Sequence, residues 1–84
     1  MTKRMRGVSK RDHEVRSRVG AAIRRIRLER GKSVKWLAGE INVDDATMSR
    51  VENGKMSIST DILDRVALAL DTSVLSFYEN NEAA

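Results

Sequence analysis

The sequence of 84 residues contains no cysteine, no proline, one histidine and only three aromatic side chains. Without cysteine the chain can form no disulfide bond, thiol nucleophile or thiolate metal site, and a lone histidine argues against structural zinc. No apolar run approaches the roughly 20 residues of a transmembrane helix, and the basic N-terminus lacks the apolar stretch of a secretory signal. We therefore expect a small cytoplasmic globular domain with no membrane segment or metal site.

Charge is distributed unevenly along the chain. Residues 1–32 carry 12 basic and 3 acidic side chains, whereas residues 33–84 carry 4 basic and 9 acidic ones. Such asymmetry favours a surface that meets a polyanion, either nucleic acid or an anionic membrane. The alternative is a solvated, arginine-rich helix face. Membrane binding would require the apolar stripe of the first helix to be free, and a domain this small needs that stripe for its core.

The first apolar stripe repeats at i, i+4, i+7, i+8 and i+11, the spacing of one face of an α-helix. It consists of Val15, Val19, Ala22, Ile23 and Ile26. This spacing predicts a helix from about His13 to Arg30, which Gly31 ends in a left-handed conformation. Residues 1–12 show no apolar period and are expected to form a flexible basic arm. Residues 79–84 are expected to fray.

Serine and aspartate residues mark the starts of the later helices, because their side chains accept hydrogen bonds from free N–H groups of a first turn. These N-caps are Ser33, Asp44, Ser59 and Ser73. The helices expected after them cover 34–41, 45–53, 60–70 and 74–78, each with apolar residues on one side. No segment shows the alternation of a strand. The predicted fold is all-α, a compact five-helix bundle over residues 13–78.

Two short helices joined by a short turn, in a small all-α domain with a basic half, suggest a helix-turn-helix over about 33–54. The segments LAGEINV (37–43) and SRVENG (49–54) resemble the Xre/Cro-like helix-turn-helix family of phage and bacterial repressors. This resemblance covers about residues 19–78 in one register. It implies a lambda-repressor-like domain that binds double-stranded DNA and regulates transcription as a homodimer on a palindromic operator, without a cofactor.

The resemblance also implies roles for individual residues. The recognition helix, about 45–53, would lie in the major groove while the preceding helix crosses the DNA backbone. The residues expected to face base edges or nearby phosphates are Asp45, Ala46, Thr47, Ser49 and Arg50, and those expected to hold the backbone are Asn53 and Lys55. Arg50 is the strong bidentate donor for a guanine edge, with a surface salt bridge as the alternative. Arg27 and Glu52 would form a structural ion pair between the first and third helices.

The sequence departs from the family pattern at the second and third helices. Val34 stands where the family commonly has glutamine, and Asp45 where it has a polar, non-acidic residue. We interpret Asp44 as a helix cap and leave open whether Asp45 caps the helix or accepts from cytosine N4. Trp36 either packs at the core edge, the favoured interpretation, or anchors a partner. The basic arm either contacts DNA or only solubilises the chain.

Three apolar side chains are left over once the predicted core is filled: Leu68, Leu75 and Tyr78. Clustered at the C-terminal end, they predict an isologous dimer interface, although scattered exposed apolar residues are also normal. An alternative function is a protein-interaction module that has lost tight DNA binding, with Val34, Trp36 and the acidic helix start contacting an unknown protein. An enzyme is disfavoured because no nucleophile–base pair, metal cluster or phosphate-binding glycine loop is present.

Overall fold

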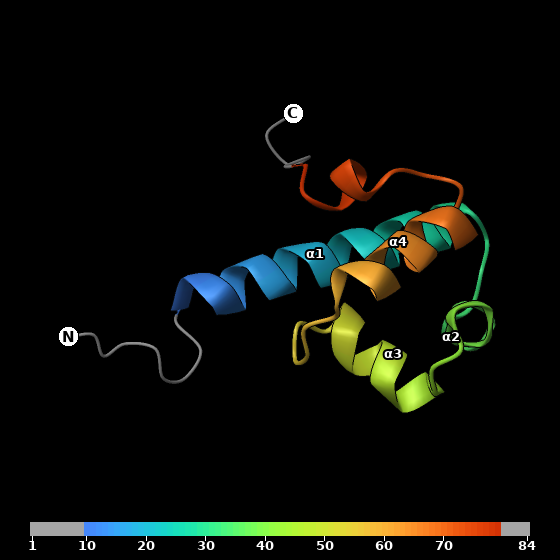
Figure 1. Cartoon of the computed structure of the whole chain (residues 1–84), viewed down its shortest axis with the longest axis horizontal. Helices are drawn as coiled ribbons and strands as arrows, with labels where there is room; N and C mark the ends of the chain where they lie inside the picture. Colours follow the sequence, from blue (N-terminus) through green and yellow to red (C-terminus); the bar gives the residue numbers. More distant parts are fainter. Residues whose placement is uncertain (1–9, 80–84) are drawn as a thin grey trace.

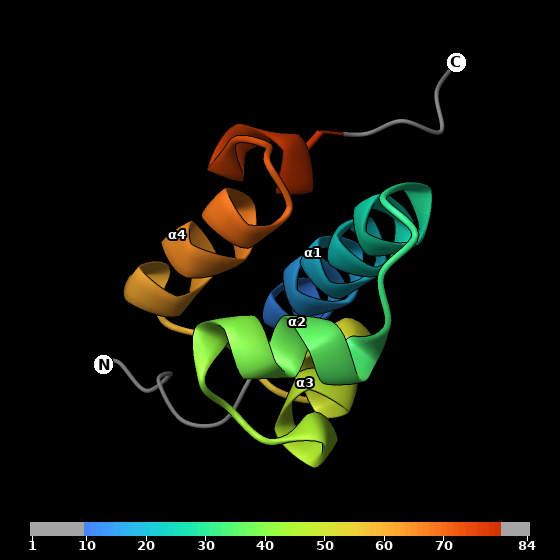
Figure 2. The same ribbon diagram turned by 90° about the vertical axis from the view of Figure 1, so that its right-hand side faces the viewer.

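The computed structural model describes residues 10–79 as four α-helices and one short 3-10 helix, with no strand in that range (Figures 1 and 2). The elements are α1 (Lys10–Glu29), α2 (Val34–Ile41), α3 (Asp45–Glu52), α4 (Thr60–Ala69) and η1 (Val74–Phe77). The all-α prediction is confirmed, but the expected fifth α-helix is a single 3-10 turn. Its four residues are too few for an α-helix of ordinary length, and Ser73 makes no side-chain cap hydrogen bond.

The first helix begins three residues earlier than expected. Residues 10–12 belong to α1 rather than to the basic arm, because Lys and Arg extend a helix readily without an apolar period. The rest of the arm, residues 1–9, and most of the expected tail, residues 80–84, lie outside the described residues. At its other end α1 stops at Glu29, where Gly31 has φ +72° and the Lys32 N–H donates to the Arg27 carbonyl over 3.1 Å.

The N-caps of α2, α3 and α4 form as expected. Ser33 accepts from the Trp36 N–H at 2.9 Å, Asp44 from the Thr47 N–H at 2.7 Å, and Ser59 from the Ile62 N–H at 3.2 Å. The bounds of α2 match the prediction, and α3 and α4 each end one residue earlier than expected. Asn42, with φ +63°, turns the chain between α2 and α3.

The core forms where α1 packs on α3 and η1, and where α2 packs on α3 and α4. It consists of Ala22, Ile23, Ile26, Leu37, Ala38, Ile41, Met48, Val51, Leu63, Val66, Ala67, Leu70 and Phe77. The predicted stripe of α1 is buried only in its second half: Val15 is 38% exposed and Val19 half-buried, because α1 extends beyond the elements that cover it. None of the helices in residues 10–79 combines the length and apolar character needed to span a bilayer.

Candidate nucleic-acid interface

The outer side of α3 carries an exposed stripe at the spacing of one helix face. Ala46, Ser49, Arg50 and Asn53 are all exposed, whereas Met48 and Val51 turn inward and are buried. Residues at i, i+3, i+4 and i+7 lie one above another on a helix, so these four side chains form one continuous surface. Such a surface, on a helix about 12 Å long, has the size and shape that can enter a DNA major groove.

Most of the residues expected to contact DNA lie on or beside this stripe. Asp45 is exposed at the start of α3, and Lys55 is exposed just after Gly54, whose φ of +73° ends the helical turn. Thr47 differs, because it is half-buried and lines a cavity over the core. Asn53 is exposed, but its side-chain amide donates to the Ser49 carbonyl over 2.9 Å.

The two carboxylates at the start of α3 have different surroundings. Asp44 caps the helix, and hydrogen bonds from the Thr47 side chain and backbone, helped by the positive charge of Arg50, hold the pKa of Asp44 below its usual range. Asp45 is exposed and accepts no hydrogen bond from the residues that the structure describes. Arg50 makes no salt bridge within the same residues, so its guanidinium is available to a ligand.

Behind the stripe, α3 is fixed to α1 by a buried ion pair. The Arg27 Nε and Nη2 atoms donate to Glu52 Oε2 and Oε1 over 2.7 and 2.9 Å, and both residues are about 95% buried, with exposures of 5% and 6%. Nη1 of Arg27 donates to the Lys32 carbonyl over 2.7 Å, so the guanidinium also holds the turn after α1. The hydrogen bonds to Glu52 raise the pKa of Arg27. The structure thus brings together the two residues expected to pair.

Other residues prove structurally important although the sequence analysis assigned them no role. Gly20 is buried where α1 touches the α3 backbone: a Cβ there would lie 2.8 Å from the Glu52 carbonyl oxygen and closer still to that of Val51. Arg30 Nε donates to the Leu70 carbonyl over 2.8 Å and so ties the end of α1 to the end of α4. A glycine inside an otherwise regular helix was the available signal for Gly20, because helix interiors disfavour glycine unless packing requires it. Nothing in the local pattern distinguishes Arg30.

Val34 and Trp36 are half-buried and pack against the core, which is the interpretation favoured above for Trp36. The Lys32 Nζ lies 4.7 Å from the centroid of the Trp36 ring, close enough for a cation–π contact. Contact with the core and the cation on its ring account for the position of Trp36 without a partner.

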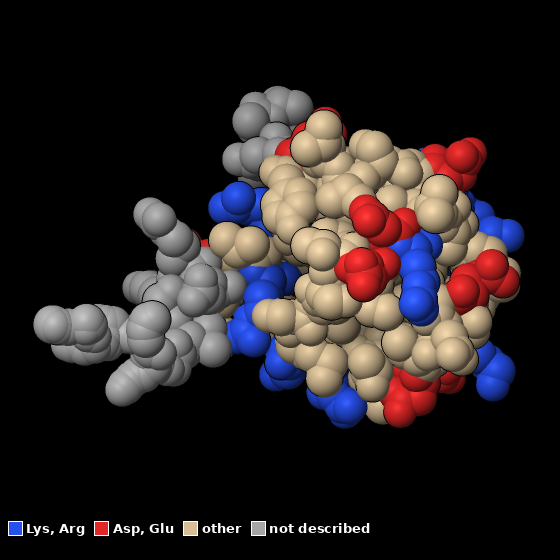
Figure 3. All heavy atoms as spheres, in the orientation of Figure 1, with Lys and Arg blue, Asp and Glu red and all other residues tan. Residues whose placement is uncertain are grey.

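Charge is segregated on the surface (Figure 3). Acidic side chains gather over α4 and again where α3 begins, whereas Lys and Arg gather along the edge below α1 and beside the C-terminal end of α3. The exposed acidic residues of α4 are Asp61 and Asp64. The C-terminal end of the recognition stripe therefore lies beside basic side chains suited to a polyanion, whereas its N-terminal end lies beside acidic ones.

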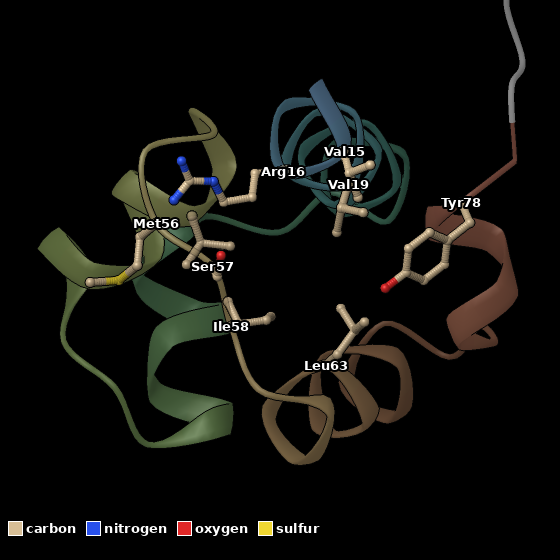
Figure 4. Close-up of a pocket in the computed structure, with 10 residues that line it drawn as sticks. Val15, Arg16, Val19, Met56, Ser57, Ile58, Leu63 and Tyr78 are labelled. Atoms are coloured by element: carbon tan, nitrogen blue, oxygen red, sulfur yellow. The ribbon is translucent and has the colours of Figure 1, made fainter. Parts of the chain in front are cut away.

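A largely apolar cavity of about 160 Å³, with Arg16 in its lining, lies between α1, the loop after α3, α4 and the end of η1 (Figure 4). Its walls include Val15, Val19, Ile58 and Leu63, and Tyr78 closes one end. Within residues 10–79 there is no group of three or more His, Asp or Glu side chains placed to hold a metal ion. The cavity and the stripe on α3 are separate surfaces.

A family model described as a helix-turn-helix domain matches residues 18–75. The chain belongs to this family. The resemblance to Xre-type regulators noted from the sequence is thereby confirmed, and the helix-turn-helix consists of α2, the turn at Asn42 and α3. No curated protein matches the chain.

Several solved structures have the same fold. The clp gene regulator ClgR from Corynebacterium glutamicum is 32% identical with a TM-score of 0.74, covering 75% of this chain and 67% of that one. An HTH_3 family transcriptional regulator from Vibrio cholerae is 25% identical with a TM-score of 0.75, covering 86% of this chain and 40% of that one. The restriction-modification controller protein C.AhdI from Aeromonas hydrophila, 23% identical with a TM-score of 0.76, covers 83% of this chain and all (100%) of its own. The helix-turn-helix chain is thus of the DNA-binding transcriptional regulator type.

Proposed function

We propose that the chain binds duplex DNA sequence-specifically, with α3 in the major groove and α2 across the backbone. The observation that supports this most directly is the exposed stripe on α3 of a helix-turn-helix domain, which carries Arg50, an arginine without an ion pair among the described residues. Arg50 would read the O6 and N7 atoms of a guanine, the commonest specific contact in the major groove. Ala46 and Ser49 would meet neighbouring base edges.

The residues that flank the stripe would hold the sugar–phosphate backbone. Lys55 is exposed next to the end of α3, and Asn53 keeps one amide N–H free after donating the other to Ser49. Thr47 is half-buried, so only the outer part of its side chain would reach DNA. Asp45, exposed and without a hydrogen bond from the described residues, would accept from cytosine N4 rather than serve as the cap, which Asp44 already provides.

The same proposal includes a homodimer formed through the C-terminal elements. Leu68 on α4 is 80% exposed, Leu75 on η1 is 72% exposed and Tyr78 is 47% exposed. Leu68 and Leu75 lie on the neighbouring elements α4 and η1, and with the exposed part of Tyr78, whose ring also closes the cavity beside α1, they would form one apolar surface suited to an isologous interface. Two recognition helices about 34–36 Å apart would then match a palindromic operator.

Selection of bound sequences from a random duplex pool tests specificity and symmetry together. We expect the bound sequences to share a palindromic consensus. Bound sequences with no consensus, or with a consensus that lacks two-fold symmetry, would contradict the proposal. On the selected site, Arg50→Ala should weaken the free energy of specific DNA binding by about 1–3 kcal/mol and relax the base preference at one base pair per half-site. Lys55→Ala should instead weaken binding equally on all sequences. Equal behaviour of the two variants on specific and random DNA would refute this division of roles.

The alternative function, a protein-interaction module without tight DNA binding, would use Val34, Trp36 and the acidic start of α3. The contacts of Val34 and Trp36 with the core disfavour it, because side chains packed inward offer little to a partner. Absence of binding to any duplex at low salt would favour the module instead.

A further inference from the structure

A broad open groove of about 520 Å³ runs between α1 and the C-terminal end of α3. Its α1 wall is built from residues at i, i+4 and i+7, namely Ser17, Ala21 and Arg24, with Arg25 beside them. On the other side it is bounded by the end of α3, where Asn53 lies. Because Asn53 belongs both to this groove and to the exposed stripe of α3, the two surfaces are continuous.

The groove carries positive charge that its own residues do not neutralise. Arg24 is exposed and Arg25 is half-buried, and neither is in an ion pair with another described residue. The acidic side chain that lines the groove, Glu52, is already held at both carboxylate oxygens by Arg27. An anion that enters therefore meets two free guanidinium groups and a carboxylate whose charge is balanced. The small side chains of Ser17 and Ala21 leave room for it along α1.

We propose that this α1 groove binds a phosphate of the DNA backbone beyond the segment that α3 reads. Arg24 and Arg25 would donate to the phosphate oxygens, for which the planar guanidinium is well matched, and Asn53 would contribute at the edge shared with α3. The inference rests on the proposed function, because the continuity of the groove with the stripe is what selects duplex DNA as the ligand. It makes α1 a positioning element for the recognition helix on DNA.

Salt dependence of DNA binding tests this site directly, because each phosphate contact adds about 0.9 to the slope of log affinity against log salt. For Arg24→Gln we expect this negative slope to become less steep by about 0.9. Raising salt fourfold would then weaken the wild type about 3.5-fold more than the variant. The loss should be the same on the selected operator and on a random duplex. Arg65→Gln is the charge control, since it removes the same charge from the acidic helix α4 and should leave the slope unchanged. Because Arg65 also donates to the Ile41 carbonyl over 3.3 Å, the melting temperature of this variant is measured alongside.

A second variant distinguishes a lost DNA contact from a loss of folding stability. Ala21 is exposed, and Ala21→Glu would place a carboxylate in the groove, four residues before Arg25, where such a pair stabilises a helix. We expect its melting temperature to be unchanged or higher while its affinity for both duplexes falls several-fold. The groove has no role on DNA if Arg24→Gln behaves like Arg65→Gln, or if Ala21→Glu binds as tightly as the wild type.

The outcomes also separate this inference from the proposed function. A wild type that discriminates its operator, loses that discrimination in Arg50→Ala and keeps its slope in Arg24→Gln would refute the groove alone. A wild type that shows no salt-dependent binding to any duplex would refute both proposals.

Discussion

Gly20 offers the sharpest test of how α1 and α3 are held together. A methyl group at this position would lie 2.8 Å from the Glu52 carbonyl oxygen, 3.0 Å from the Glu52 carbonyl carbon, and closer still to the Val51 oxygen. Carbon–oxygen contacts in proteins ordinarily lie at about 3.3–3.6 Å. All three obstacles are backbone atoms, so the contact can be relieved only if α1 and α3 separate. Gly39, within α2, is the natural comparison, because a methyl group there would meet nothing within 4 Å.

The expected effect follows from two opposing terms. Replacing glycine by alanine in a helix gains about 1 kcal/mol of helix propensity at either position. At Gly20 this gain is opposed by overpacking, which typically costs about 1–3 kcal/mol and here falls at or above the upper end because the backbone must move. We expect Gly20→Ala to lower the free energy of unfolding by about 2 kcal/mol and Gly39→Ala to raise it by about 0.5–1 kcal/mol.

Thermal unfolding followed by circular dichroism measures both effects. For a domain of this size about 1 kcal/mol shifts Tm by roughly 4–8 °C, so Gly20→Ala should melt about 8–16 °C below the wild type and Gly39→Ala a few degrees above it. A Gly20→Ala variant as stable as Gly39→Ala would show that α1 and α3 do not meet as closely as described.

Three further predictions concern the ion pair, the cap and the assembly. In chemical denaturation, Arg27→Met alone should lower the free energy of unfolding by about 3–5 kcal/mol. The double variant Arg27→Met/Glu52→Leu should recover much of this stability, and an equal loss in both variants would refute a coupled pair. Because the pKa of Asp44 is lowered in the folded state, the stability deficit of Asp44→Ala should be full at neutral pH. It should shrink as pH falls below about 4 and the carboxylate is protonated, and a pH-independent deficit would contradict this. Light scattering should find a dimeric wild type and a monomeric Leu68→Glu/Leu75→Glu variant, and the same mass for both would refute the interface.

The sequence predicts those parts of the fold that depend on local chemistry. Ser33, Asp44 and Ser59 are N-caps in the structure because a side-chain oxygen before a helix satisfies its own first turn, whatever lies around it. The environment of Thr47, in contrast, depends on tertiary contacts. Thr47 sits two residues from the exposed Asp45, yet its burial depends on Met48 and on Ile58 in the loop after α3, residues that help line the same cavity.

Tertiary contacts explain the remaining differences. Val15 continues the apolar period of α1 but is partly exposed, because no helix covers the first turns of α1. The α1 groove could not be predicted for the same reason: it needs Arg24 and Asn53, 29 residues apart in the sequence, to lie on one surface. Glu52 could be paired with Arg27 only through the family resemblance, since nothing local connects two side chains separated by 25 residues.

The contacts that fix α3 are gathered on its inner side and at its C-terminal end. Gly20 meets the backbone of Val51 and Glu52, Arg27 holds the Glu52 side chain, and Gly54 closely approaches Ser17 of α1. The outer stripe takes no part in these contacts between helices, and its interactions stay within α3 and its caps, where Asn53 donates to the Ser49 carbonyl and the charge of Arg50 acts on Asp44. Changes that move α3 should therefore alter Tm and DNA affinity together, whereas Arg50→Ala should alter affinity and sequence preference at an unchanged Tm. A lowered Tm in Arg50→Ala would mean that the stripe supports the fold, and reading of DNA could not then be assigned to it separately.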